Sequence, residues 1–474
     1  MKFLVRIFRH QQGLFVNRIL NVDLSPKNFL FGVALSFGAF FLCDVAKADA
    51  EWTVLIYAQA NNSLGHFAYK SFNDMASVGS DKELNVLVQW YKFGEHGTFR
   101  YKIEKEKMQL DQCISTPTDG NKVEDLVGAM QWAVTKYPAK KYCLVLWNHG
   151  IGILDPAWGH SAMMAVNPNF FKDNPRIQIE DLTLQALETE DSTHPQLAEG
   201  YPYRADFYRG ILFNERSRTY MNNQVLSQAL SKIKTNILNN KKIDILGMDA
   251  CLMAMIEVGY QIKDYANYMV GSQEVELAYG WDYKSILQAL SGQKLSPLEV
   301  VESIILTYKE LYKKQIQFYT QSAFDLEKIA LLKDSIDEVV RNMLVCYELD
   351  KKGFSGVLKN ARNKCLRFST PTYVDLQSFF QELLYQSQLA YHDNKKIKKI
   401  PQLKQSLEFL QQAIMIGQAA IKDTVVASVA GSYYNRASGL SIYFPVQSIN
   451  NSYEKTEFAK DSLWHDFLKK IIYW

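Results

Sequence analysis

Two strand-like stretches constrain the fold of this 474-residue chain more than any other feature. Residues 142–147 read YCLVLW, a continuous apolar run, and residues 243–248 read IDILGM, which is apolar except for Asp244. A continuous apolar run is typical of a strand that is buried on both faces of a parallel sheet. Other strand-like and helix-like stretches alternate along the chain, at residues 53–58, 64–78, 85–89, 123–136 and 268–272. We therefore predict an α/β fold, with a mostly parallel sheet between layers of helices.

The chain after residue 295 is predicted to be mainly helical, with two late strands. Helix-like stretches lie at residues 298–314, 326–348 and 403–422, and strand-like stretches at 425–430 and 440–444. We expect residues 49–295 to form the main sheet domain and residues 296–474 to pack on that sheet.

The first 48 residues are typical of a secretory signal peptide with a long basic region at its start. Residues 29–43 are apolar and follow several Lys and Arg residues, and Ala46-Lys47-Ala48 follows the run. The run is shorter than the roughly 20 residues that a membrane-spanning helix needs. We predict cleavage after Ala48 and export to the periplasm or beyond; an uncleaved membrane anchor is the alternative.

Charge and cysteine content narrow the class of protein. Residues 1–48 hold six of the 53 basic and two of the 50 acidic side chains, so the rest of the chain has a net charge of about −1. This argues against a nucleic-acid partner, which calls for a basic face. Five of the six cysteines remain, widely spaced, so they form neither a metal motif nor a disulfide framework, and at least one thiol is free.

Residues 155–209 interrupt the α/β pattern. Five of the twelve prolines fall there, together with an acidic stretch. A long irregular insertion in a compact domain is usually a functional loop or a disordered segment.

Polar residues directly after two apolar strands are the candidates for chemistry. His149 and Gly150 follow the run at 142–147, and Asp249 and Cys251 follow the run at 243–248. Ligands of open α/β sheets bind at the carboxyl ends of the strands. If these strands are neighbours, the imidazole of His149 faces the thiol of Cys251. Such an arrangement can catalyse acyl transfer through a thiolate. We also expect Cys251 in the first turn of a helix over 251–263, where the helix dipole lowers the pKa of a thiol.

Each candidate residue has a structural alternative. Taken alone, Cys251 is interpreted as a buried core thiol and His149 as a loop residue. Asp249 reads equally well as the N-cap of the helix over 251–263. Another His-Gly pair, His96-Gly97, lies in a polar stretch several residues past its strand and lacks this context.

The residues at both strand ends resemble the clostripain family of cysteine peptidases, which is grouped with caspases, legumains and gingipains. The resemblance lies in WNHG at residues 147–150 and in DACLMAMIEVGY at residues 249–260. Further stretches agree in order, among them WTVLIYAQANNSL, YMVGSQEVELAYGWDY, GLSIYFP and FAKDSLWHDFL. Together they cover most of residues 51–470.

The resemblance implies a caspase-like catalytic domain with His149 and Cys251 as the catalytic dyad. The backbone amides of Gly150 and Cys251 are expected to hold the oxyanion. Asp249 is expected to line the pocket for a P1 side chain that is Arg or Lys, because a carboxylate in a partly desolvated pocket favours a cation. The sequence departs from the family at Tyr279, where relatives commonly carry a second pocket carboxylate. Glu274 and Glu276 are close enough in sequence to replace it, or they are solvated loop charges.

The resemblance also implies a zymogen that is cut between the dyad residues after a basic side chain. The separation of His149 and Cys251 is longer than expected for the family, and the excess matches the insertion. Candidate cleavage positions are Arg176, Arg204 and Arg209; the alternative is an insertion that stays intact.

The predicted function is that of a secreted cysteine endopeptidase acting on proteins or peptides as a monomer, with no membrane contact after signal cleavage. We expect no cofactor or metal to be required. A role for calcium is suggested only by the family resemblance, because calcium activates some relatives. The alternatives are an inactive caspase-like binding module, and a transpeptidase or ligase that uses the same dyad.

Overall fold

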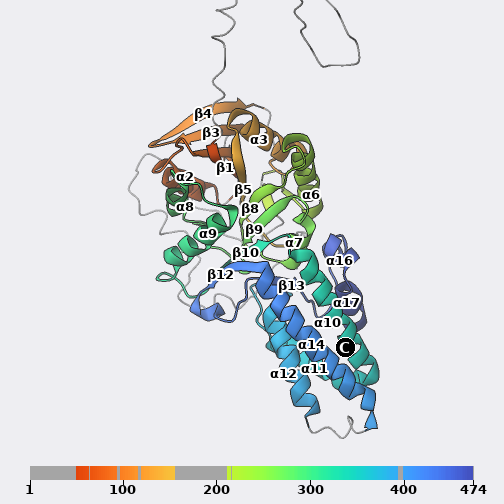
Figure 1. The fold of residues 1–474 in the computed structure, drawn as a ribbon. Helices are drawn as coiled ribbons and strands as arrows, with labels where there is room; N and C mark the ends of the chain where they lie inside the picture. The colour runs from red at the N-terminus through yellow and green to blue at the C-terminus, as the bar shows by residue number, and fades with distance from the viewer. Residues whose placement is uncertain are drawn as a thin grey trace, which may run out of the picture. The chain divides into compact units, whose positions relative to one another are not determined.

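The computed structural model describes residues 50–62, 64–92, 97–115, 119–154, 211–214, 216–392 and 399–472. These residues belong to one unit by their contacts and contain a nine-stranded sheet in the order β12-β10-β9-β8-β5-β1-β2-β3-β4 (Figure 1). Its strands are β1 (Ala50–Ala60), β2 (Leu84–Lys92), β3 (Thr98–Glu104), β4 (Lys107–Ile114), β5 (Ala139–Trp147), β8 (Ile243–Asp249), β9 (Ala266–Gly271), β10 (Thr320–Asp325) and β12 (Val425–Ala430). Two small antiparallel pairs accompany it, β6 (Ile211–Asn214) with β7 (Thr219–Met221) and β11 (Tyr373–Asp375) with β13 (Ser441–Tyr443).

The centre of the sheet is parallel and its two ends are antiparallel. Strands β2, β1, β5, β8 and β9 pair in parallel. Strands β3 and β4 extend one end as an antiparallel hairpin, and β10 and β12 extend the other. The predicted α/β fold with a mostly parallel sheet is confirmed, with these antiparallel additions at the ends.

Both faces of the central strands are buried, which explains their continuous apolar runs. In β1, Trp52 and Ile56 point into the core on one face, whereas Leu55 and Tyr57 point into the core on the other. Successive side chains of a strand point to opposite faces, so a strand between two helical layers carries apolar residues on both faces.

Helices cover both faces of the sheet (Figure 1). The helices packed in one core are α3 (Val123–Lys136), α6 (Asn223–Lys232) and α7 (Ile256–Ile262), with the π-helical turn η2 (Ile233–Ile237) after α6. Those packed in the other core are α2 (Gly65–Ala76), α8 (Tyr283–Leu290) and α9 (Pro297–Tyr312).

The later part of the chain forms long helices and returns to the sheet. Its elements are α10 (Ile329–Leu349), α11 (Lys351–Lys364), α12 (Leu376–Tyr391), α14 (Pro401–Thr424), the short 3-10 turn η3 (Ser432–Tyr434), α15 (Asn451–Glu454), α16 (Glu457–Asp461) and α17 (Trp464–Ile471). Helix α14 leads directly into β12, and Trp464 donates a hydrogen bond to the carbonyl oxygen of Tyr443 at 2.8 Å. Strands β10 and β12 therefore tie the helices to the sheet that carries β1.

The strongly patterned elements were predicted within a few residues, and the polar ones were missed. The helix over 123–136 is confirmed at both ends, and the strands at 53–58 and 142–147 are confirmed as parts of β1 and β5. Strand β10 reads TQSAFD, which lacks a strong strand pattern, and it pairs with antiparallel partners on both sides, β9 and β12. Such context can place a strand where local propensity does not predict one.

Several predicted features lie outside the described residues. These are the signal peptide at 1–48 and almost the whole insertion at 155–209. The proposed domain limits stay predictions. In the part of the chain that the structure describes, no helix is both long and apolar enough to cross a membrane.

Leu246 tests the burial of one face of β8. It is fully buried and pairs with Leu144 on β5 and Met269 on β9. We expect Leu246→Ala to lower the free energy of unfolding by about 2–5 kcal/mol, because it leaves a cavity between helices and sheet. Leu110→Ala on β4, where the side chain is 52% exposed, should change it by less than about 0.5 kcal/mol. Denaturant unfolding followed by circular dichroism measures both; equal losses would contradict the assignment.

Candidate active site

His149 and Cys251 follow neighbouring parallel strands at the same edge of the sheet. In the β5–β8 pair, Trp147 lies opposite Asp249, and the amide of Asn148 donates to the carbonyl oxygen of Asp249 at 3.3 Å. The pairing therefore continues past the strand ends, toward the two candidate residues. The structure brings together the two segments that the sequence singled out.

Gly150 allows the close approach of these segments. A Cβ atom on Gly150 would lie 2.5 Å from the carbonyl oxygen of Cys251 and 3.0 Å from Cβ of Ala250. Any side chain at residue 150 would push the two segments apart, so the glycine is a geometric requirement.

The predicted helix over 251–263 is wrong at its start. Helix α7 begins at Ile256, and Cys251 lies in a turn, where Leu252 has a left-handed φ of 62°. The amide of Leu252 donates to the carbonyl oxygen of Glu274 at 3.1 Å, so the turn pairs with another loop. The helix dipole therefore does not act on the Cys251 thiol, and the expected lowering of its pKa does not follow.

Burial instead raises the pKa of the Cys251 thiol to about 12, and the nearby carboxylates of Glu276, Glu274 and Asp249 add to the shift. The side chain is 7% exposed. Its sulfur accepts a hydrogen bond from the amide of Glu276 at 3.3 Å and lies 3.8 Å from the carbonyl oxygen of the same residue. In this conformation the thiol is neutral at neutral pH.

His149 is likewise neutral in this conformation. It is 9% exposed, and burial lowers the pKa of its imidazole to about 4. A neutral imidazole can accept a proton from a neutral thiol, so the two residues have the protonation states that general-base activation requires.

Asn148 is a site residue that the sequence reasoning missed. Its side-chain amide donates to the carbonyl oxygens of Phe213, at 3.0 Å, and Gln59. Its side-chain oxygen accepts from the amide of Asn62 at 3.0 Å and from the backbone N–H of His149. Asn148 therefore ties the His149 segment to the loop after β1. The sequence did contain a sign of this part of the site, because polar residues follow β1, and β1 ends at the same edge of the sheet as the strand before His149.

Asp249 is the last residue of β8 and does not cap a helix, so the N-cap alternative is wrong. It is 5% exposed, and its Oδ2 accepts from the Tyr283 hydroxyl at 2.7 Å and from the amide of Trp281 at 3.3 Å. Gly280 packs against the same carboxylate. Burial raises the pKa of Asp249, while its hydrogen bonds lower it.

Glu274 and Glu276 are buried, so the expectation that they are solvated charges is wrong. Glu276 accepts a hydrogen bond from the side-chain amide of Gln321 at 3.0 Å, and burial together with the neighbouring Asp249 raises the pKa of Glu276 well above its usual value. Glu274 points elsewhere and accepts from the amide of Ser369 at 2.9 Å and from the Tyr434 hydroxyl. Sequence spacing could not tell which of the two glutamates lies near Asp249, because they stand two residues apart in one loop.

Tyr279 turns toward helix α2. Its ring makes an edge-to-face contact with Phe67, at 5.5 Å between centroids, and Lys70 lies 4.0 Å above it. The structure therefore places the Tyr279 side chain against α2, although the neighbouring Gly280 touches Asp249.

The candidate cleavage positions and a possible metal site remain to be considered. Arg176, Arg204 and Arg209 belong to the undescribed segment. Among the described residues, no group of three or more His, Cys, Asp or Glu side chains is arranged to hold a metal ion.

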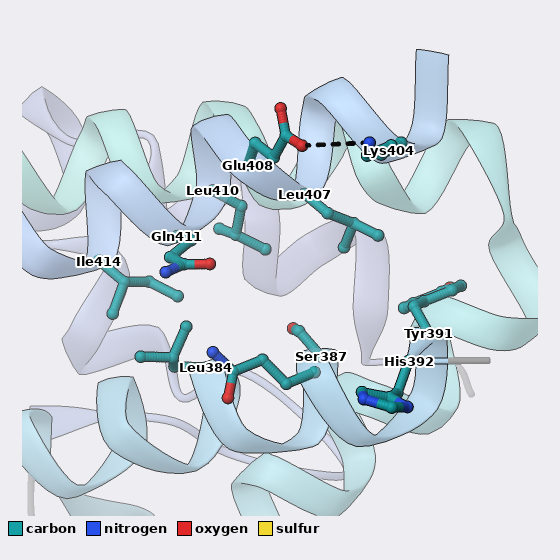
Figure 2. Close-up of a pocket in the computed structure, with 11 residues that line it drawn as sticks. Leu384, Ser387, Tyr391, His392, Lys404, Leu407, Glu408, Leu410, Gln411 and Ile414 are labelled. Atoms are coloured by element: carbon teal, nitrogen blue, oxygen red, sulfur yellow. Dashed lines mark ion pairs between the residues drawn. The ribbon is translucent and has the colours of Figure 1, made fainter. Parts of the chain in front are cut away.

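A pocket of about 220 Å³ lies away from these residues, between α12 and α14. Figure 2 shows Leu384 and Ser387 of one helix facing Leu410 and Ile414 of the other, with the Lys404–Glu408 ion pair at its rim. It contains none of the candidate residues.

Comparison with known proteins decides the family. A sequence profile described as the clostripain family, peptidase family C11, matches residues 56–195 and 192–474. The chain belongs to the clostripain family of cysteine peptidases. No curated protein is similar enough in sequence to count as a match.

Solved structures of clostripain-family peptidases share the fold. A secreted C11 cysteine protease from Bacteroides thetaiotaomicron, solved with an irreversible peptide inhibitor, is 20% identical, with a TM-score of 0.55 over 88% of this chain and 99% of that chain. An inactive zymogen C11 protease from Parabacteroides distasonis is 18% identical, with a TM-score of 0.53 over 87% and 98%. A second secreted C11 protease from Bacteroides thetaiotaomicron, iotapain, is 15% identical, with a TM-score of 0.54 over 89% and 100%.

Gly280 of this clostripain-family peptidase tests how tightly Asp249 is enclosed. Gly280 has a φ of +63°, and a Cβ there would lie 2.6 Å from both carboxylate oxygens of Asp249. Gly292 has a φ of +66° and no atom within 4 Å of the same position. We expect Gly292→Ala to cost about 1–2 kcal/mol of stability for backbone strain alone.

Gly280→Ala should cost roughly 1–3 kcal/mol more than this control, because the methyl group displaces the carboxylate. Denaturant unfolding of both variants measures the difference. Equal losses would show that Asp249 is not enclosed as described.

Proposed function

We propose that this chain is a secreted cysteine endopeptidase in which Cys251 is the nucleophile and His149 is the general base and acid. The single observation that supports it best is the position of the two residues after adjacent, paired strands, β5 and β8. Membership of the clostripain family agrees with this reaction.

The proposed reaction moves one proton through the imidazole. Cys251 Sγ attacks the carbonyl carbon of the scissile bond as its proton passes to His149. His149 then donates that proton to the leaving amine, which leaves a thioester. A water molecule, deprotonated by His149, attacks the thioester and releases the acid and the free thiol. Both groups start neutral, so no charge has to be buried before the substrate arrives.

We further propose that the amides of Gly150 and Cys251 hold the oxyanion. Amides that are fixed before the reaction stabilise the charge that develops on the carbonyl oxygen. The support is the close packing of Gly150 on Cys251, which leaves no room for a side chain there.

Asp249 is proposed to select Arg or Lys at P1. It lies two residues before Cys251 on the same strand end, and a buried carboxylate favours a cation over a neutral side chain. Because Asp249 is 5% exposed, a P1 side chain reaches it only when the loop that carries Gly280 moves. Tyr279 supplies no carboxylate to this pocket.

Export is proposed from the signal-like residues 1–48 and from the secreted structural relatives. The proposed reaction uses only side chains and backbone amides of the chain itself, and it needs no cofactor. A requirement for calcium is expected only from the family resemblance, and activity before and after treatment with a calcium chelator tests it.

Substitution of the dyad tests the reaction. With a peptide that carries Arg at P1, Cys251→Ala should reduce hydrolysis to background, because it removes the nucleophile. His149→Ala should lower kcat by roughly 10²–10⁴-fold, because it removes proton transfer. Cys143→Ala is a matched control, since Cys143 is another buried thiol, on β5, and should stay active.

Retained hydrolysis in Cys251→Ala would refute the proposed nucleophile. Absence of hydrolysis in the wild type would favour the inactive binding module. Product masses with and without an added amine separate hydrolysis from acyl transfer to that amine.

Self-processing within residues 155–209 is proposed from the family resemblance. A cut after Arg204 or Arg209, with a second after Arg176, would separate the His149 segment from the Cys251 segment along the chain. We expect N-terminal sequencing of incubated wild type to find these new ends, and incubated Cys251→Ala to lack them. The same fragments in both proteins would mean that another protease makes the cut.

A further inference from the structure

Five buried side chains that end in an amide group lie close to the segment that carries His149. They come from the end of β1 and the loop after it, from the residue after β5, and from the end of β6, and they are 0–4% exposed: Gln59, Asn61, Asn62, Asn148 and Asn214. A side-chain amide has two donors and an acceptor, and an unpaired donor or acceptor in a buried place is costly. Such a cluster therefore holds the segments that contribute to it in one arrangement.

The side chain of Asn148 connects three segments of the chain. Its Nδ2 donates to the carbonyl oxygen of Phe213 at 3.0 Å and to that of Gln59, and its Oδ1 accepts from Asn62 Nδ2 at 3.0 Å. Both of its donors and its acceptor are thus paired with β6, with β1 or with the loop after β1. The carbonyl oxygen of Phe213 also accepts from Asn62 Nδ2 at 2.9 Å, so the three segments are bonded to one another as well.

The main chain of Asn148 continues the pairing of β5 with β8. Its backbone N–H donates to the carbonyl oxygen of Asp249 at 3.3 Å, two residues before Cys251. His149 is the next residue, and its backbone N–H donates to Asn148 Oδ1. Asn148 is therefore held by the strand that leads to the proposed nucleophile and, through its side chain, by the amide cluster.

We propose that Asn148 is a positioning residue, which fixes the His149 segment relative to Cys251 so that the imidazole is in place to take the thiol proton. This inference rests on the proposed peptidase function. Asn148 itself takes no proton and acts only through His149. Proton transfer needs the two groups within hydrogen-bond reach, and a misplacement of about 1 Å can cost on the order of 10²-fold in rate.

A general contribution of Asn148 to the stability of the fold is the alternative. Loss of a buried, hydrogen-bonded amide lowers stability wherever that amide lies. Asn121 offers a matched control, because it is a buried asparagine, 7% exposed, whose side chain donates to the Thr219 hydroxyl. Removal of the Asn121 side chain costs a buried amide and leaves the hydrogen bonds of Asn148 in place.

Steady-state hydrolysis of a peptide with Arg at P1 by the full-length protein separates the two roles. Asn148→Ala should lower kcat by roughly 10–100-fold and change KM by less than about threefold, because proton transfer and not substrate binding depends on the imidazole. Asn121→Ala should keep kcat within about twofold of the wild type. Denaturant unfolding of both variants sets the conditions in which each is fully folded.

Asn62→Ala is a second and milder variant. It removes the donor to Asn148 Oδ1 and leaves the two bonds from Asn148 Nδ2. We expect a smaller loss of kcat than in Asn148→Ala, again with little change in KM. The double variant should be about as slow as Asn148→Ala alone, because residues that act as one unit are not additive. If Asn148→Ala does not fold, Asn62→Ala decides the question by itself.

Three kinetic results would overturn the inference. One is a wild-type kcat in Asn148→Ala, or in Asn62→Ala where the former does not fold. Another is an equal loss of kcat in Asn121→Ala, because a general loosening of the fold would then explain both variants. The third is a raised KM with an unchanged kcat, which would assign Asn148 to substrate binding.

Amide hydrogen exchange followed by mass spectrometry needs no turnover, so it separates this inference from the peptidase proposal. In Asn148→Ala, or in Asn62→Ala as its substitute, we expect the peptide over residues 144–152 to exchange up to about tenfold faster than in the wild type. The peptide that contains β11 should not change. A loss of kcat without faster exchange at 144–152 would overturn the inference. Faster exchange there, in a protein whose wild type hydrolyses no peptide, would support the anchoring of the His149 segment by Asn148 and refute the peptidase proposal.

Discussion

The pairing of β5 with β8 runs in register from Cys143 opposite Ile245 to Trp147 opposite Asp249, and the candidate site depends on it. Parallel strands end at the same edge of a sheet, so segments about a hundred residues apart in the sequence leave the sheet side by side. A shift of this register by one residue would turn each strand's side chains to the opposite face. The buried residues on both faces of the central strands oppose such a shift.

Burial sets the electrostatic state of the site more strongly than any helix dipole. It raises the pKa of Cys251 and lowers that of His149, so both groups are neutral. It also raises the pKa of Glu276 well above its usual value. A site of this kind keeps few charges until a substrate brings its own, which agrees with a cation as the proposed P1 side chain.

The loop over residues 272–281 connects the site with the later helices. Gln273 donates to the Asp375 carboxylate at 3.1 Å, and the amide of Ser369 donates to Glu274 at 2.9 Å. The backbone N–H of the next acid along the loop, Glu276, donates to Cys251 Sγ at 3.3 Å. The region after residue 295 is therefore hydrogen-bonded to the loop that contacts Cys251.

The sequence by itself determined the central strands and the two polar strand ends, because burial on both faces demands continuous apolar runs and because His149 and Cys251 directly follow such runs. Family motifs then identified the dyad and Asp249 as candidates. Only the tertiary structure decided that Cys251 lies in a turn and that the backbone of Glu276 contacts it. These features arise from contacts between loops that are distant from one another in the sequence, and local sequence propensity does not predict such contacts. Strand β10 was missed for the same reason, since it pairs with partners on both sides and has little pattern of its own.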